Sequence, residues 1–226
     1  MFDRLKRDLQ QALDPTKPMS QRGQPTIETL LPGDVVSLWD GGDHVVQAVL
    51  DCREELNRRE VAWRWNLLDG GGMIASSPEG ATFFDRTAVL NQASAEFETL
   101  TADPEQGGVL KAFEARVRQG IAARNPTLFE FEGKVYRVVS TGIFDARPVG
   151  QTGLPKTAVW RDVNLSNPGD NVYFELEPTE ESADPTEPNE VLGIWTTHIA
   201  LLFGRALRPA DITSIYPRAE PESRER

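Results

Sequence analysis

Residues 30–68 read LLPGDVVSLWDGGDHVVQAVLDCREELNRREVAWRWNLL, and this stretch decides the fold. Three runs rich in β-branched and aromatic residues occupy 35–39, 44–51 and 61–68. Glycine and aspartate separate the first two runs, and both residues tolerate the positive φ angles of tight hairpin turns. Such runs suit a half-buried pleated surface, so the stretch predicts three strands joined by turns.

The rest of the chain adds further strands to this unit. Two short strands are expected at 72–78 and 82–85. A glycine turn, a valine-rich strand and a Trp-Arg strand then recur in the same order as in the opening stretch. The recurring runs are 131–139, 158–165 and 169–175, and the last strands are expected at 191–195 and 198–203. This recurrence predicts a duplicated β-meander.

Two segments carry the spacing of amphipathic helices. The apolar stripe of the first segment, residues 1–14, consists of Phe2, Leu5, Leu9 and Leu13. An isolated helix of this length is marginal in water, so the stripe must dock either on its own sheet or on a partner. A second helix is predicted near 104–123, because Pro104 suits a first turn and Pro126 ends the run.

These elements predict a mainly β fold (β+α) with two duplicated antiparallel β-meander or small-barrel-like halves, a connecting helix and an N-terminal amphipathic helix. The expected parts are an N-terminal helix and linker at 1–26, a first half at 27–90, a helical connector at 91–126, a second half at 127–216 and a disordered tail at 217–226. The acidic, proline-rich segment 178–190 is expected to be a mobile, solvated loop, because like charges repel and little apolar area is available for burial.

Charge and composition narrow the classes of function. The chain of 226 residues holds 24 Lys and Arg against 35 Asp and Glu, which gives a formal net charge of −11. An acidic surface repels phosphate backbones and anionic lipid headgroups, so no nucleic-acid partner is expected. The sequence has no secretory signal and no apolar run near the roughly 20 residues that span a bilayer. A cytoplasmic location without membrane insertion is therefore expected.

The sequence lacks the common motifs of catalysis and cofactor binding. The single cysteine, Cys52, excludes an intrachain disulfide, and with His44 and His198 it reaches neither the count nor the spacing of a metal site. Residues 150–157 look superficially like a phosphate loop, but Pro155 removes an amide that would cradle phosphate. The sequence therefore predicts no catalytic, cofactor-binding or metal-ligating residue and no cofactor.

The tryptophans carry the strongest remaining signal for a binding surface. All of them fall on predicted strands: Trp39, Trp63, Trp65, Trp160 and Trp195. Trp63 and Trp65 share one strand face because side chains alternate along a strand. They are expected to form a core between the halves or, alternatively, to line a groove with Arg64 and Arg161 exposed on the opposite face. With the N-terminal stripe, Trp63 and Trp65 are the candidate interaction residues.

The layout resembles a bacterial family known as domain of unknown function 4178. The segments that carry the resemblance, which covers residues 27–216, are LLPGDVV at 30–36, VVQAVL at 45–50, the Trp strand at 61–68, FEGKVYRV at 131–138 and the segment 195–211. This chain departs from the family pattern in a longer charged hairpin at 54–60 and in an acidic insertion near Glu180. The resemblance implies no known activity or catalytic residue, and it suggests an accessory role beside membrane-stress proteins.

Two classes of function remain open. The first is a non-catalytic module that binds protein partners, membrane-associated stress proteins among them, or a second copy of itself. The alternative is a carboxylate-based hydrolase or small-ligand-binding protein with a site between the two halves. Its candidate carboxylates are Asp34, Asp69 and Asp162. A buried cleft with paired carboxylates would favour this alternative, whereas a bare apolar edge would favour protein assembly.

Overall fold

The structure, a computed structural model, shows a framework of β-strands. The residues that it describes are 25–39, 42–56, 59–90, 119, 122, 127–150, 153–157, 159–166, 171–180, 188–196 and 198–218. The first strands are β1 (Val35–Leu38), β2 (Gly42–Leu56), β3 (Arg59–Leu68), β4 (Met73–Ser77) and β5 (Gly80–Leu90). The later strands are β6 (Leu128–Phe131), β7 (Lys134–Pro148), β8 (Asn171–Pro178), β9 (Glu190–Trp195), β10 (Ile199–Ala206) and β11 (Ile212–Tyr216). Short 3-10 turns are η2 (Ile27–Thr29), η3 (Asp69–Gly71) and η4 (Pro209–Asp211).

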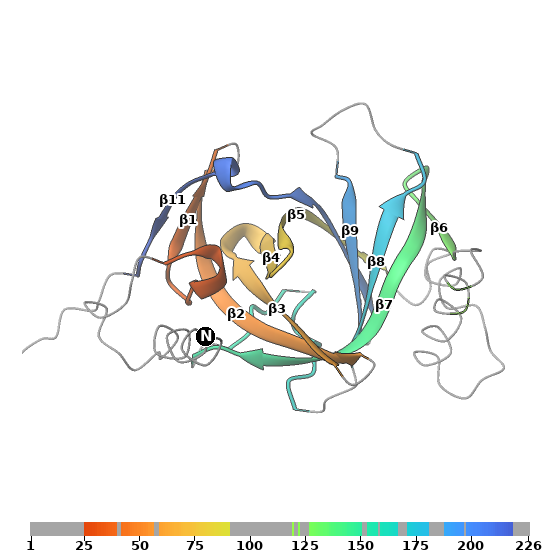
Figure 1. The fold of residues 1–226 in the computed structure, drawn as a ribbon, viewed down its shortest axis with the longest axis horizontal. Helices are drawn as coiled ribbons and strands as arrows, with labels where there is room; N and C mark the ends of the chain where they lie inside the picture. The colour runs from red at the N-terminus through yellow and green to blue at the C-terminus, as the bar shows by residue number, and fades with distance from the viewer. Residues whose placement is uncertain are drawn as a thin grey trace, which may run out of the picture.

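Eight of these strands close into one antiparallel β-barrel (Figure 1). Hydrogen-bonded neighbours follow the order β2-β3-β4-β5-β10-β9-β8-β7, and β2 pairs with β7 to complete the ring. This closing ladder runs from the pair Leu50 and Pro148 to the pair Arg53 and Asp145. Strands β11 and β1 extend the sheet beyond β2, and β6 extends it beyond β7. Closure leaves the eight barrel strands without a free edge.

The predicted pair of separate meander halves is wrong. The strands of 27–90 and those of 127–216 pair with each other at three places: β5 with β10, β2 with β7, and β1 with β11. The first two pairings close a single barrel. No connecting or N-terminal helix is present among the residues that the structure describes. The segments predicted to form those helices, 1–14 and 104–123, lie outside the described residues apart from residues 119 and 122, which are both helical.

The strands predicted in the opening stretch are confirmed as β1, β2 and β3, although Trp39 itself lies in the turn that follows β1. Glycine supplies the backbone angles that the hairpins need. Gly42 has a φ of +78° at the start of β2, and Gly133 has a φ of +76° between β6 and β7. Residues with a side chain rarely adopt this conformation, so glycine marks where each hairpin can turn.

One predicted strand, 158–165, is wrong. Residues 159–162 form turns. Val159, Trp160 and Val163 pack into the interior cluster, where the ring of Trp160 lies 5.8 Å from that of Trp65. The segment therefore fills part of the barrel with apolar side chains, and its expected correspondence to strand 61–68 fails.

The core has an interior cluster and two outer ones. Alternation along each strand sends one set of side chains inward and the other outward. The interior set includes Leu50, Trp65, Phe144, Leu192 and Leu202. Outside the barrel, one cluster gathers residues of η2, β1 and β2, and the other gathers residues of β6, β8 and β10. The barrel is thus packed on both faces of its wall.

Arg64 shows how the outer face of β3 is covered. Its Nε donates a hydrogen bond of 2.8 Å to Oδ1 of Asp51, and its Nη1 donates to the backbone carbonyl of Glu28 beside η2. Arg64 is buried, whereas the groove alternative expected it to be exposed. The guanidinium therefore ties the turn before β1 to the barrel wall.

Candidate functional site

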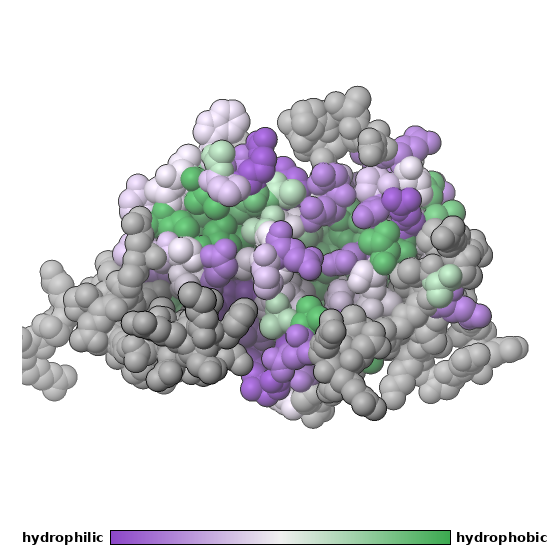
Figure 2. Space-filling model, in the orientation of Figure 1, coloured by the Kyte–Doolittle hydropathy of each residue, from purple (hydrophilic) through white to green (hydrophobic). Residues whose placement is uncertain are grey.

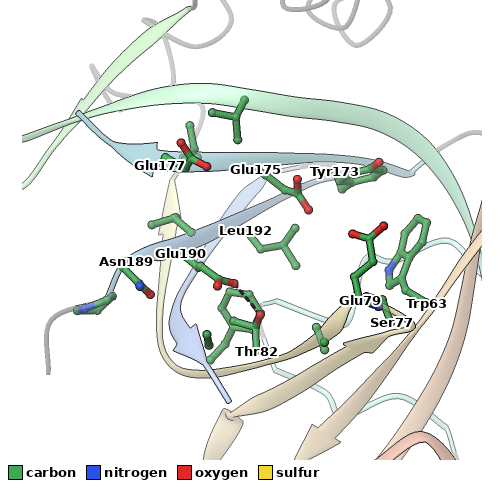
Figure 3. A pocket seen from close by; sticks show the side chains of 18 of the residues that line it. Trp63, Ser77, Glu79, Thr82, Tyr173, Glu175, Glu177, Asn189, Glu190 and Leu192 are labelled. Carbon is green, nitrogen blue, oxygen red and sulfur yellow. Dashed lines mark hydrogen bonds between the residues drawn. The ribbon is translucent and has the colours of Figure 1, made fainter. Parts of the chain in front are cut away.

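A pocket of about 1410 Å³ opens into the barrel between β3–β5 on one side and β7–β9 on the other (Figure 3). Its inner wall combines aromatic, apolar and acidic side chains. The lining side chains include Trp63 (β3), Ser77 (β4), Thr82 (β5), Arg137 (β7), Tyr173, Glu175 and Glu177 (β8), Glu190 and Leu192 (β9), and Glu79 in the turn between β4 and β5. Strands from both sides of the segment 91–126 therefore form one site.

The wall of the pocket is aromatic near Trp63. The Trp63 ring lies 5.3 Å from the Tyr173 ring in an edge-on contact and 6.0 Å from the Phe144 ring. Trp65, two residues further along β3, lies 6.2 Å from Trp63 and is buried at the base of the same face. Such packing locks the rings in position, so Trp63 presents a fixed surface to the pocket.

Strand β8 places carboxylates on the inner face of the barrel. Its sequence alternates, with Val172, Phe174 and Leu176 in the outer core cluster and Tyr173, Glu175 and Glu177 lining the pocket. Because successive side chains point to opposite faces of a strand, these two sets must separate in this way. Glu79 reaches into the same space as Glu175 from the opposite wall (Figure 3).

The carboxylates differ in the partners that they have among the described residues. Glu177 forms an ion pair of 2.8 Å with Nη2 of Arg137. Glu190 accepts a hydrogen bond of 2.6 Å from the hydroxyl of Thr82. Glu175 is surrounded by acids: burial raises the pKa of its carboxyl, the Ser140 hydroxyl acts in the opposite direction, and the charges of Glu190, Glu177 and Glu79 raise it further.

Tyr173 precedes Glu175 and Glu177 on the pocket-facing side of β8. Its hydroxyl donates a hydrogen bond of 2.8 Å to Oε2 of Glu54, a buried carboxylate on β2. Burial and the Glu54 carboxylate together raise the pKa of Tyr173 well above its ordinary value, so the phenol stays protonated at neutral pH. On the same strand, the backbone carbonyl of Tyr173 accepts a hydrogen bond from the Thr141 hydroxyl, which fixes β8 against β7.

The structure brings two of the predicted interaction residues together. Trp63 and Trp65 both line the pocket, and Trp65 is also buried in the interior cluster, so the pair contributes both to the groove and to the core. The predicted apolar stripe, Phe2, Leu5, Leu9 and Leu13, lies outside the residues that the structure describes. The expected sharing of one strand face by Trp63 and Trp65 is confirmed by their ring contact.

The predicted carboxylates Asp34, Asp69 and Asp162 lie apart from this pocket. Asp34 accepts backbone hydrogen bonds from Leu31 and Arg218. Asp69 accepts one from the backbone of Val45 and lies 3.9 Å from Nδ1 of His44. The structure therefore gives Asp34 and Asp69 roles in holding turns.

Asp162 lies near His198, away from both Asp34 and Asp69. Its carboxylate lies 3.1 Å from Nδ1 of His198, at the turn between β9 and β10. Cys52 is buried in the interior cluster, and burial raises the pKa of its thiol. Across the described ranges, no three His, Cys, Asp or Glu side chains are grouped closely enough to hold a metal ion.

Comparison with known proteins gives no relative: no family model, no curated protein and no solved structure matches this chain. The resemblance to domain of unknown function 4178 therefore stays a prediction. In the part of the chain that the structure describes, no helix is both long and apolar enough to cross a membrane.

Sequence reasoning missed the pocket glutamates. The composition of 175–190 favours a solvated loop, but β8 extends to Pro178 and β9 begins at Glu190, so both ends of the segment belong to the sheet. Residues 181–187 of the predicted loop 178–190 lie outside the described residues. The period-two order Val-Tyr-Phe-Glu-Leu-Glu at 172–177 is the signal that would have found Glu175 and Glu177. No pattern in the sequence links Glu79 to them, because the contact arises from barrel closure.

Proposed function

We propose that the protein binds a small organic molecule in the open mouth of its barrel. The observation that carries this proposal is the pocket between β3–β5 and β7–β9, whose wall combines the Trp63 and Tyr173 rings with the carboxylates of Glu79 and Glu175. Small-molecule sites are typically concave and largely apolar, with a few placed polar groups that set orientation. This pocket has that composition.

The strands around the pocket support binding without a large rearrangement. Two strands hold Tyr173 in place: Thr141 on β7 binds its backbone carbonyl, and Glu54 on β2 binds its hydroxyl. Trp63 is packed between Trp65, Phe144 and Tyr173. Side chains that are already locked in place lose little conformational entropy when a ligand arrives, so a preformed site favours affinity.

A panel of small molecules tests the proposal directly. The full chain is titrated with neutral, cationic and anionic compounds of similar size, and binding is followed by calorimetry and by tryptophan fluorescence. We expect at least one chemical class to bind and to change the emission, because Trp63 lines the pocket. We also expect Ala75→Phe and Ser77→Trp, which place bulk on the pocket wall, to abolish that binding.

Two controls keep this test decisive. Leu128→Phe adds similar bulk at an exposed position of β6 outside the pocket, and it should leave the affinity unchanged. Thermal melting of each variant reports whether the barrel is still folded. If both pocket-filling variants are folded and bind every hit as the parent chain does, the ligand lies elsewhere and the proposal is wrong.

A second candidate function, protein association, is supported by the surface near β1 and β11. Trp39 is 78% exposed in the turn after β1, and Tyr216 is 56% exposed on β11. On the face drawn in Figure 2, however, hydrophobic areas of the described residues are separated by hydrophilic side chains. Light scattering of Trp39→Ser tests the candidate. A solution mass equal to that of the parent chain would show that Trp39 takes no part in self-association.

A further inference from the structure

The pocket carries an excess of negative charge, which bears on the class of ligand if the proposed binding function is right. Its charged lining residues are Glu60, Glu79, Glu175, Glu177, Glu180 and Glu190 against Lys134 and Arg137. A concave site lined by one sign of charge concentrates ligands of the opposite sign and repels those of the same sign. The acidic excess therefore disfavours anionic ligands at this site.

The positive charge of Arg137 neutralises Glu177 and not Glu175, the other pocket glutamate of β8. Arg137 pairs with Glu177 through both Nε and Nη2, at 3.2 and 2.8 Å. Glu175 instead has the Ser140 hydroxyl and three neighbouring acids. The Glu79 carboxylate has no hydrogen bond or ion pair within the described part of the chain. Glu175 and Glu79 therefore reach the pocket from opposite walls without the arginine that neutralises Glu177 (Figure 3).

Several ångströms separate the charges along this wall. Residues two apart on a strand, such as Glu175 and Glu177, lie about 7 Å apart at their Cα atoms. Glu175 is opposite Leu192 in the register of β8 and β9, so an apolar side chain stands beside the acids. Glu79 comes from the far wall (Figure 3). A ligand that contacts acids on both walls therefore needs its positive charges joined by a chain, and Leu192 offers that chain an apolar contact.

The aromatic wall fits the same ligand. Trp63 lies next to Glu79 in the pocket, and the Tyr173 ring continues the wall toward Glu175 (Figure 3). Aromatic rings attract organic cations through their π faces, and they also pack against alkyl chains. An ammonium or guanidinium group at this place meets a carboxylate and a ring together.

We propose that the ligand of the barrel is a flexible organic cation with at least two amino or guanidinium groups, held by Glu175 and Glu79 and packed against Trp63. One charged group is placed at Glu175 and another at Glu79, and the connecting chain lies over Leu192. Binding neutralises carboxylates that otherwise repel one another, so the ligand relieves a cost already present in the free barrel.

The test compares a diamine with a diol and a dianion of the same carbon number, and adds spermine as a longer polyamine. The full chain is titrated at neutral pH and low salt with 1,5-diaminopentane and spermine, with the neutral 1,5-pentanediol, and with the dianion glutarate. We expect the diamine to bind at least about tenfold more tightly than the diol or glutarate, because each charge-assisted contact strengthens binding. The affinity should fall as salt is raised, since screening weakens ionic contacts.

Three single substitutions locate the interaction. Glu175→Gln and Glu79→Gln should each weaken diamine binding by about three- to tenfold while leaving the diol unaffected. Glu130→Gln removes the same charge from an exposed position of β6 outside the pocket, and it should change the affinity less than about twofold. Circular dichroism and thermal melting confirm that each variant is folded.

The possible results separate this inference from the proposed function. If diol or glutarate binds as well as diamine and Ser77→Trp blocks all of them, the pocket binds small molecules and the cationic assignment is overturned. If oligolysine binds while the free diamine and spermine do not, the assignment to a small molecule is overturned. If no compound of any charge binds, the proposed function fails and this inference fails with it.

Discussion

The hydroxyl of Tyr173 on β8 donates a hydrogen bond of 2.8 Å to Oε2 of Glu54 on β2, inside the barrel. These two strands are not neighbours, because β7 lies between them in the sheet. The contact therefore crosses from one wall strand to the next but one, and it binds the two sides of the closing seam. Glu54 is buried, so the donor that Tyr173 supplies matters for stability.

We expect Tyr173→Phe to destabilise the protein by roughly 1–3 kcal/mol, since a buried carboxylate loses a hydrogen-bond donor. Urea denaturation at pH 7 measures the effect. Tyr216→Phe, which removes a hydroxyl from an exposed tyrosine on β11, is the matched control and should change stability by less than about 0.5 kcal/mol. Equal stability of the two variants would show that the Tyr173 bond contributes nothing.

Trp160 tests whether the segment after β7 belongs to the barrel core. It is 1% exposed and packs against Trp65, so Trp160→Ala should cost about 3–5 kcal/mol through lost burial and a new cavity. Trp39→Ala removes the same ring from an exposed turn and should change stability by less than about 0.5 kcal/mol. Chemical denaturation of both variants makes the comparison, and a small effect at Trp160 would contradict the packing described above.

Gly193 on β9 leaves room for the ring of Phe174 on β8. A Cβ atom at position 193 would clash with Cζ of Phe174, so the ring or the strand would have to move. Gly193→Ala should therefore destabilise the barrel by about 1–3 kcal/mol. Among the described residues, no atom lies within 4 Å of the methyl group that Gly153→Ala would add, so this variant should be nearly neutral. Thermal and urea unfolding of the two variants provide the measurement.

A rescue experiment separates crowding from loss of backbone freedom at position 193. Adding Phe174→Leu to Gly193→Ala removes part of the ring that the new methyl group meets. If crowding is the cause, the double variant should lose less stability than the sum of the two single variants. Strict additivity would instead point to an effect of alanine on the strand itself.

The pH dependence of stability should report the acidic pocket. The carboxyl of Glu175 has a pKa above its ordinary value of 4.5 in the folded chain, because of burial and the charges of Glu190, Glu177 and Glu79. Between the ordinary and the raised pKa the folded state binds more protons than the unfolded state, so stability falls as pH rises through that window. The ligand-free protein should therefore lose stability from pH 4.5 upward at this site.

Glu175→Gln isolates this contribution. The variant should melt at a higher temperature than the parent chain at pH 7, and the two should converge as pH falls below 4.5, where both side chains are neutral. Scanning calorimetry across this range supplies the melting temperatures, with Glu130→Gln as the control. A melting temperature of Glu175→Gln below that of the parent at pH 7 would show that the carboxylate stabilises the free barrel.

The sequence by itself determined where most strands lie. The β-branched runs at 35–39 and 61–68 and the alternation at 172–177 are local patterns, and local patterns report how one segment presents its two faces. The glycine at position 133 likewise marks a hairpin turn, because glycine adopts a positive φ without steric cost. The strand pattern also places Trp63 and Trp65 on one face, as the structure confirms.

Only the tertiary structure decided that the strands close into one barrel and that a pocket opens inside it. Pairing of β2 with β7 and of β5 with β10 joins residues far apart in the chain, and alternating patterns do not say which strand edges meet. In the closed barrel, Glu175 points inward, where the charge of Glu79 acts on it. Trp160, which was expected on a strand, packs into the interior cluster. The physical reason is that burial of an inner face depends on the whole ring of strands, whereas a turn or an alternation depends only on its own few residues.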